Sequence, residues 1–179
     1  LTPDNPFGFQ PHLRPDTNGW SAVRGMVMED QNDKALVFDR DTQAILASVP
    51  TEGSTEGDCV ITQDGSLGFV SRFDFNLLAI DLQADPPAPA GPPNPIPIAN
   101  AGEDIAASPD GKYLVICDGN GVAPISVVDA PTRTEISALA QVTDCTSVEV
   151  CPDGTVLAGS FSDNSIRRLE LSAAGVLSD

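Results

Sequence analysis

The stretch SPDGKYLVICDGNGVAPISVVD, residues 108–129, decides the fold. It opens on a Pro-Asp-Gly turn, in which proline presets one backbone angle and glycine tolerates a positive φ. Runs of Tyr, Leu, Val and Ile follow, separated by Gly, Asn and Pro, and this punctuation is typical of β-strands. We therefore predict four strands in this unit, over residues 104–108, 112–117, 124–129 and 133–140.

The same turn recurs along the chain at a nearly constant interval. CVITQDGSLGFVSR and VEVCPDGTVLAGSF are close copies of it, and LRPDTNGWSAVRGMV is a weaker one. The turn glycines lie 46, 46 and 43 residues apart, at Gly19, Gly65, Gly111 and Gly154. A second anchor, an apolar run that ends on an acid, recurs at intervals of 42, 48 and 41 residues, at Asp39, Asp81, Asp129 and Glu170. Two anchors with nearly the same period indicate one repeated unit of about 45 residues.

Four antiparallel strands in a repeat of this length are typical of a β-propeller blade. We therefore expect a single all-β domain over residues 1–179, a β-propeller of about four four-stranded antiparallel blades. The expected repeat units are residues 9–50, 56–99, 102–141 and 145–179. A proline-rich insertion, residues 85–99, interrupts the second unit. Because proline has no N–H to donate to a ladder, we place this insertion on a sheet edge or in a surface loop.

The pattern SPDGKYLVI…ISVVD resembles the YVTN-type propeller repeats of surface-layer and lactonase-like proteins. The resemblance covers three units well and the first unit poorly. It implies the propeller fold, in which seven blades are common in this family and four is the sparse end of the range. The chain, which begins at Leu1 without Met, is therefore expected to form a partial ring, a ring shared between chains, or a small closed ring. Because an open ring leaves unpaired strand edges, we expect a second copy or another chain as its partner.

The composition argues against several classes of partner. Twenty-six acidic and nine basic residues give a net charge of −17, which repels nucleic acid and anionic membrane surfaces. No apolar run approaches the roughly 18 residues of a spanning helix, so we expect no membrane insertion. An acidic surface with only two lysines is typical of extracellular, calcium-exposed or salt-adapted proteins. We therefore expect an extracellular, cell-surface or periplasmic location.

Acidic residues recur in the loops that should open on one face of the expected propeller. Clustered carboxylates suit hard cations, calcium above all, which take six to eight oxygen ligands. The candidate ligands are Asp30, Asp33, Asp58, Asp104, Asp118, Asn120 and Asp163. The competing interpretation is that Asp, Asn and Gly recur there because they form turns well.

Catalytic motifs are sparse. His12 is the only histidine, so a Ser-His-Asp or Cys-His system has one candidate base and a multi-histidine metal site is excluded. A metal-assisted, lactonase-like site would use Asp58, Asp104 and Asn120. We hypothesise a non-catalytic binding or assembly scaffold that associates with itself. The alternatives are a fragment of a carboxylate- or metal-dependent lactonase-like hydrolase and a structural subunit of an extracellular polymer.

The four cysteines form no CxxC pair, which argues against a zinc or thioredoxin-like site. Cys117 and Cys145 should lie toward the same end of neighbouring blades, so a disulfide between them would join the two blades. Such a bond requires Cα atoms within about 7 Å. Buried thiols are the alternative for the same residues.

Overall fold

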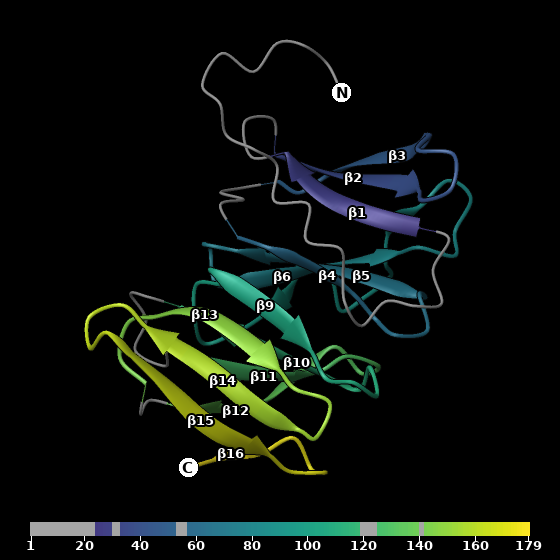
Figure 1. The fold of residues 1–179 in the computed structure, drawn as a ribbon. Coiled ribbons are helices and arrows are strands. Elements are labelled where there is room, and N and C mark those ends of the chain that lie inside the picture. The colour runs from purple at the N-terminus through teal and green to yellow at the C-terminus, as the bar shows by residue number, and fades with distance from the viewer. Residues whose placement is uncertain (1–23, 30–32, 53–56, 119–124, 140–141) are drawn as a thin grey trace.

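The computed structural model describes residues 24–29, 33–52, 57–118, 125–139 and 142–179. These residues form sixteen β-strands and no helix. The strands make four antiparallel sheets that follow one another in a row along the chain (Figure 1). None of the described residues lies in a helix that could cross a membrane. The predicted all-β fold of antiparallel blades is confirmed.

We call the four sheets blades 1 to 4, in chain order. Blade 1 has the strand order β1 (Arg24–Glu29), β2 (Lys34–Asp39) and β3 (Ile45–Pro50). Blade 2 contains β4 (Cys59–Ile61), β5 (Leu67–Arg72), β6 (Asn76–Asp81), β7 (Ala88–Pro89) and β8 (Ile96–Pro97). Blade 3 contains β9 (Asp104–Ala107), β10 (Tyr113–Cys117), β11 (Ile125–Asp129) and β12 (Thr134–Leu139). Blade 4 contains β13 (Cys145–Val150), β14 (Thr155–Ser160), β15 (Ser165–Leu171) and β16 (Leu177–Ser178).

Blade 3 agrees best with the sequence. Its four strands begin and end within one residue of the predicted ranges wherever the structure describes both ends. In blade 1 the described strands correspond to the second, third and fourth strands of blade 3. The residues that would form the first strand of that blade fall within 1–23, outside the described residues.

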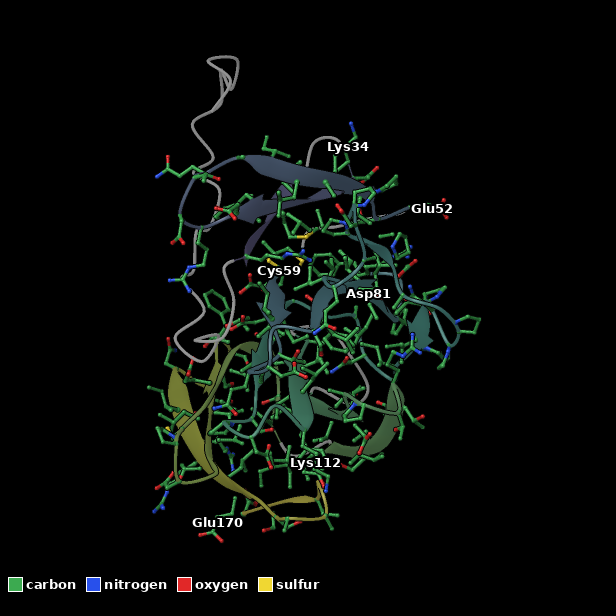
Figure 2. All side chains as sticks on the ribbon, turned by 90° about the vertical axis from the view of Figure 1, so that its right-hand side faces the viewer. Lys34, Glu52, Cys59, Asp81, Lys112 and Glu170 are labelled. Atoms are coloured by element: carbon green, nitrogen blue, oxygen red, sulfur yellow. The ribbon has the colours of Figure 1, made fainter. Side chains whose placement is uncertain are left out.

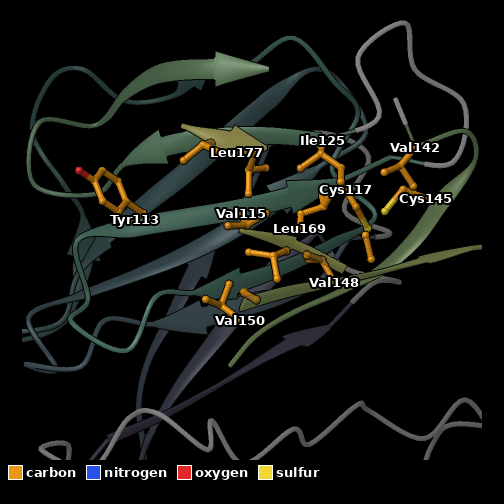
Figure 3. Close-up of a cluster of buried hydrophobic side chains, with 14 residues drawn as sticks. Tyr113, Val115, Cys117, Ile125, Val142, Cys145, Val148, Val150, Leu169 and Leu177 are labelled. Carbon is orange, nitrogen blue, oxygen red and sulfur yellow. The ribbon is translucent and has the colours of Figure 1, made fainter. Parts of the chain in front are cut away.

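The hydrophobic core lies between neighbouring blades. Strand β10 shows why, because all five of its residues are buried. Successive side chains of a strand point to opposite faces of its sheet. Leu114 and Ile116 accordingly pack against blade 2, whereas Tyr113, Val115 and Cys117 pack against blade 4 (Figure 3). The uninterrupted apolar run of this strand is therefore explained by its place between two sheets.

The proline-rich insertion forms the outer edge of blade 2, as predicted. Strands β7 and β8 are two residues long, and both pair with β6. Between them, the Asn94 side chain takes the place of a strand residue. Its Nδ2 donates to Ala79 O and its Oδ1 accepts from Ala79 N, both at 2.9 Å. A side-chain amide thus supplies the ladder donor and acceptor that the surrounding prolines cannot provide in full.

The row of blades is an open arc. Blades 1 and 2 touch through β1 and β4, blades 2 and 3 through β4 and β9, and blades 3 and 4 through β9 and β13. Blade 1 and blade 4 lie at opposite ends of the row (Figure 1). In the described part of the chain, each of these two blades is therefore packed against another sheet on one face only.

Candidate functional site

One face of the arc carries the Asp-Gly turns. The Asp64 carboxylate accepts from Thr62 Oγ1 at 2.7 Å and from Ser66 N at 3.0 Å. Asp110 accepts from Ser108 Oγ at 2.6 Å and from Lys112 N at 3.0 Å in the equivalent turn of blade 3. The recurring aspartates on this face therefore stabilise their own turns.

These hydrogen bonds also set the ionisation of the turn acids. Donation from Ser66 N lowers the pKa of Asp64, and donation from the Ser108 hydroxyl lowers the pKa of Asp110. Donation from Thr155 N lowers the pKa of Asp153 in blade 4. A hydrogen bond to the charged form of a carboxylate favours that form. None of the three acids is therefore tuned to take up a proton near neutral pH.

A hollow of about 560 Å³ separates the turns of blades 2 and 3. It is lined by Gln63, Asp64, Asp110, Gly111, Lys112 and Pro131. The Lys112 ammonium stands 4.7 Å from the centroid of the Tyr113 ring. The other lysine, Lys34, lies toward the opposite end of the molecule (Figure 2). Four of its six lining residues have polar or charged side chains, and both of its carboxylates are engaged in turn hydrogen bonds.

The opposite face carries Asp58 and Asp104, two of the acids that the sequence put forward as cation ligands. Asp104 is 3% exposed, and its two oxygens accept from backbone N–H groups. Oδ1 accepts from Ile105 N at 3.0 Å, and Oδ2 accepts from Val148 N of blade 4 at 2.9 Å. Asp58 makes the equivalent local bond, accepting from Cys59 N at 2.8 Å. The Asp104 carboxylate thus ties β9 to β13.

The remaining candidates are spread over the structure. Buried Asp118 accepts from Ala101 N at 3.0 Å, and exposed Asp163 accepts from Thr143 Oγ1 at 3.0 Å. Asp33 is exposed, in a turn with a φ of 50°. Asp30 and Asn120 lie outside the described residues. Among the residues that the structure does describe, no three His, Cys, Asp or Glu side chains gather in a way that could hold a metal ion. The cation site stays a prediction.

Sequence reasoning missed Arg72, which is only 6% exposed. Its guanidinium forms an ion pair with Asp74 and donates to the carbonyl of Glu52. Its Nε atom, Thr51 Oγ1 and Asn100 Oδ1 are buried without a hydrogen-bond partner among the described residues. Buried polar atoms are normally satisfied by protein or by water, so these three atoms are exceptions within the described part of the chain. The only sequence feature that could have pointed to this buried arginine is its position at the end of an apolar strand.

Two thiols meet between blades 3 and 4. Cys117 and Cys145 are both fully buried in the same cluster, and their side chains lie side by side in Figure 3. The hydrogen bond with Cys145 and burial raise the pKa of the Cys117 thiol. Cys145 Sγ also donates to Ser147 O at 3.6 Å. The structure holds both residues as thiols, and the disulfide between them stays a prediction.

No family model matches the chain, and no curated protein matches it. Many solved structures are similar to it, and three of them illustrate the likeness. The first, of a functionally unknown protein from Desulfotomaculum acetoxidans, is 25% identical over 88% of this chain and 50% of its own, with a TM-score of 0.77. The second, hydrazine synthase of Kuenenia stuttgartiensis, is 18% identical over 94% of this chain and 50% of its own, with a TM-score of 0.75.

The third structure is of a protein from Bacteroides uniformis named as a candidate 6-phosphogluconolactonase. It is 18% identical over 87% of this chain and 50% of its own, with a TM-score of 0.70. The chain thus spans about half the length of each of these structures. These likenesses show the fold, a propeller-like arrangement of antiparallel blades that a lactonase-like protein shares.

Proposed function

We propose that the chain is a non-catalytic assembly scaffold of the cell surface, periplasm or extracellular space, which binds a second copy of itself through its two end blades. The observation that carries this proposal is the open arc, whose end faces are partly apolar. In a closed propeller each blade is covered on both faces by its neighbours. We call the outward face of blade 1 the head face and the outward face of blade 4 the tail face.

The head face is apolar. In β2, Ala35 and Val37 are buried against blade 2, so Leu36 and Phe38 project from the other side. Val27 of β1 pairs with Leu36 and lies on that same side. All three outward side chains are half-buried. The head face therefore has the residue pattern of a blade that packs on both sides.

The tail face is mixed. In β14, Val156 and Ala158 are buried against blade 3, so Leu157 projects outward and is 38% exposed. Ile166 pairs with Gly159 on the same side and is 75% exposed. A large apolar side chain in this position favours a contact with another protein surface over contact with water.

Charge favours a second copy as the occupant. Arg168 pairs with Leu157 and so lies on the tail face. The protein has only nine basic residues and carries a net charge of −17. A second copy is thus itself an acidic partner for this arginine, and such complementarity steers association.

The size of the similar structures supports the same geometry. Each is about twice as long as the part that this chain covers. Two copies arranged head face to tail face would bring about eight blades into one ring, within the range of known propellers. A two-fold axis through the ring would relate the two identical contacts.

Paired face variants test this arrangement by sedimentation. Leu36→Asp places a charge on the head face and Ile166→Asp places one on the tail face. Each variant alone should sediment as a single chain, whereas a one-to-one mixture should recover dimers through the one contact left intact. Phe75→Asp is the control, because Phe75 is 52% exposed on blade 2, away from both end faces.

The outcomes separate the alternatives. A dimer that Ile166→Asp leaves intact would contradict the head-to-tail contact and favour a head-to-head one. A dimer that survives both changes would contradict assembly through the end faces. Growth of long particles in place of dimers would favour the structural polymer, since head-to-tail contacts that do not close make fibres.

A lactonase-like hydrolase is the second candidate. It is supported by the likeness to the protein named as a candidate 6-phosphogluconolactonase and by the acids Asp58 and Asp104 on one face. Calcium bound by such acids could polarise a lactone carbonyl. Hydrolysis of a sugar-acid lactone that is lost on chelation and on Asp58→Asn would favour this candidate over the scaffold.

A further inference from the structure

We propose that Cys117 and Cys145 form a disulfide that links blade 4 covalently to blade 3. This inference does not depend on self-association. It concerns the end blade, which the described structure holds through a single blade interface. A covalent link at that interface would keep blade 4 in place whether or not a second copy binds its outward face.

The two side chains are placed to meet. Cys117 ends β10 in blade 3, and Cys145 begins β13 in blade 4. The two strands are in contact, and both sulfur atoms lie in the hydrophobic cluster between the blades (Figure 3). The two side chains lie side by side in that cluster.

The backbone around the thiols is already fixed. Cys117 pairs with Asp104 in the ladder of blade 3. The Asp104 carboxylate accepts from Val148 N, which belongs to the same strand as Cys145. The two thiols therefore lie beside a buried hydrogen bond between the strands that carry them. A disulfide that fits this backbone without moving it would store little strain and add stability.

The other two cysteines are poor substitutes for this pair. Cys59 Sγ donates to Met26 O at 3.7 Å, in the interface between blades 1 and 2. Cys151 follows the last residue of β13, at the opposite end of that strand from Cys145. The arrangement of the four residues therefore selects a single pairing.

The chemistry is thiol–disulfide exchange with a disulfide acceptor, either oxidised glutathione or the disulfide of a thiol oxidoreductase. The two protein thiols lose two protons and two electrons, and one S–S bond forms between Cys117 and Cys145. The S–S bond of the acceptor breaks, and the acceptor leaves as two thiols. Such acceptors act outside the reducing cytosol, in the compartments proposed above.

Burial decides when the reaction occurs. Exchange requires a thiolate, and neither sulfur is exposed in the folded chain. The bond should therefore form during folding, before blade 4 closes over blade 3, or when blade 4 opens transiently. Once formed, it should be shielded from reductants in the same way.

The test uses the full chain, refolded with oxidised and reduced glutathione and compared with chain kept reduced. In the variant Cys59→Ala/Cys151→Ala, only the proposed pair remains. We expect a product lighter by two hydrogen atoms, in which a peptide with Cys117 is joined to one with Cys145 until reductant is added. We expect reduction under unfolding conditions, followed by refolding, to lower the Tm by about 5 to 10 °C.

The matched control is Cys117→Ala/Cys145→Ala, whose Tm should not respond to reductant. Alkylation of both Cys117 and Cys145 after the oxidised chain is unfolded without reductant would overturn the proposal. So would a link from either residue to Cys59 or Cys151 in the unsubstituted chain, or a Tm that is the same in both redox states. Because every readout is taken on a dilute chain, failure of self-association would leave these results unchanged.

Discussion

Blade 3 and blade 1 are built on the same repeat but differ in what covers them. In blade 3, β10 is buried on both faces, by blade 2 on one side and by blade 4 on the other. In blade 1, Val37 is fully buried against blade 2, whereas Leu36 beside it is only half-buried. The repeat therefore specifies a sheet with two apolar faces, and the position of the blade in the row decides whether both faces are buried by neighbouring blades.

The largest effect should come from emptying the covered face of blade 3. Leu114→Ala removes a fully buried side chain between blades 2 and 3, and we expect it to cost about 2 to 5 kcal/mol. The matched change on the head face, Leu36→Ala, should cost about 1 kcal/mol or less in the monomer. Urea unfolding of both variants measures the difference. Equal losses would mean that the head face is covered as well as the interior.

The next effect tests the link between the last two blades. Asp104→Asn keeps the size of the side chain but removes the charge that accepts from Val148 N, so we expect a loss of about 1 to 3 kcal/mol. The control is Asp163→Asn, at an exposed acid, which should cost less than about 0.5 kcal/mol. A result in which the exposed change costs as much as the buried one would contradict the structural role of Asp104.

Asn94→Ala should weaken the edge of blade 2. It removes one donor and one acceptor from the ladder opposite Ala79, and we expect a loss of about 1 to 2 kcal/mol. Hydrogen exchange at the Ala79 amide should accelerate in the variant. Protection that stays unchanged would show that the insertion is held by its prolines alone.

The smallest effect we predict is a change in how stability depends on pH, caused by the aspartates of the turns. The folded-state pKa values of Asp64 and Asp110 are lowered from their ordinary value of 3.8, so the unfolded chain binds protons more readily than the folded one. The two acids therefore stabilise the folded chain at pH values above 3.8, and this stabilisation is lost as the pH falls through their lowered folded-state pKa. Asp64→Asn/Asp110→Asn should therefore lose less stability on acidification than the unsubstituted chain. If both proteins lost the same stability on acidification, titratable groups other than Asp64 and Asp110 would be responsible for the acid sensitivity.

The repeat could be predicted from the sequence because its signals are local. A turn such as Ser108 to Lys112 contains its own hydrogen bonds, and a run such as Tyr113 to Cys117 is apolar whatever surrounds it. The roles of the acids could not be predicted in the same way. Asp104 accepts from Val148, 44 residues away, and no pattern of neighbours reports such a contact.

The same limit applies to the polar details of blade 2. Composition placed the proline-rich insertion at an edge, but it could not show that the Asn94 amide would bond to Ala79, 15 residues away. Arg72 was missed because its partners, Glu52 and Asp74, come from a different blade and from its own loop. The acids near the turns looked like possible ligands because turn-forming and cation-binding residues are the same types.

The most direct test of the open arc is the native mass of the unsubstituted chain, measured by light scattering across a wide dilution series. The account predicts a particle of twice the 18.6 kDa chain mass that dissociates to single chains on dilution. A particle that stays at 18.6 kDa at every concentration would contradict assembly through the head and tail faces.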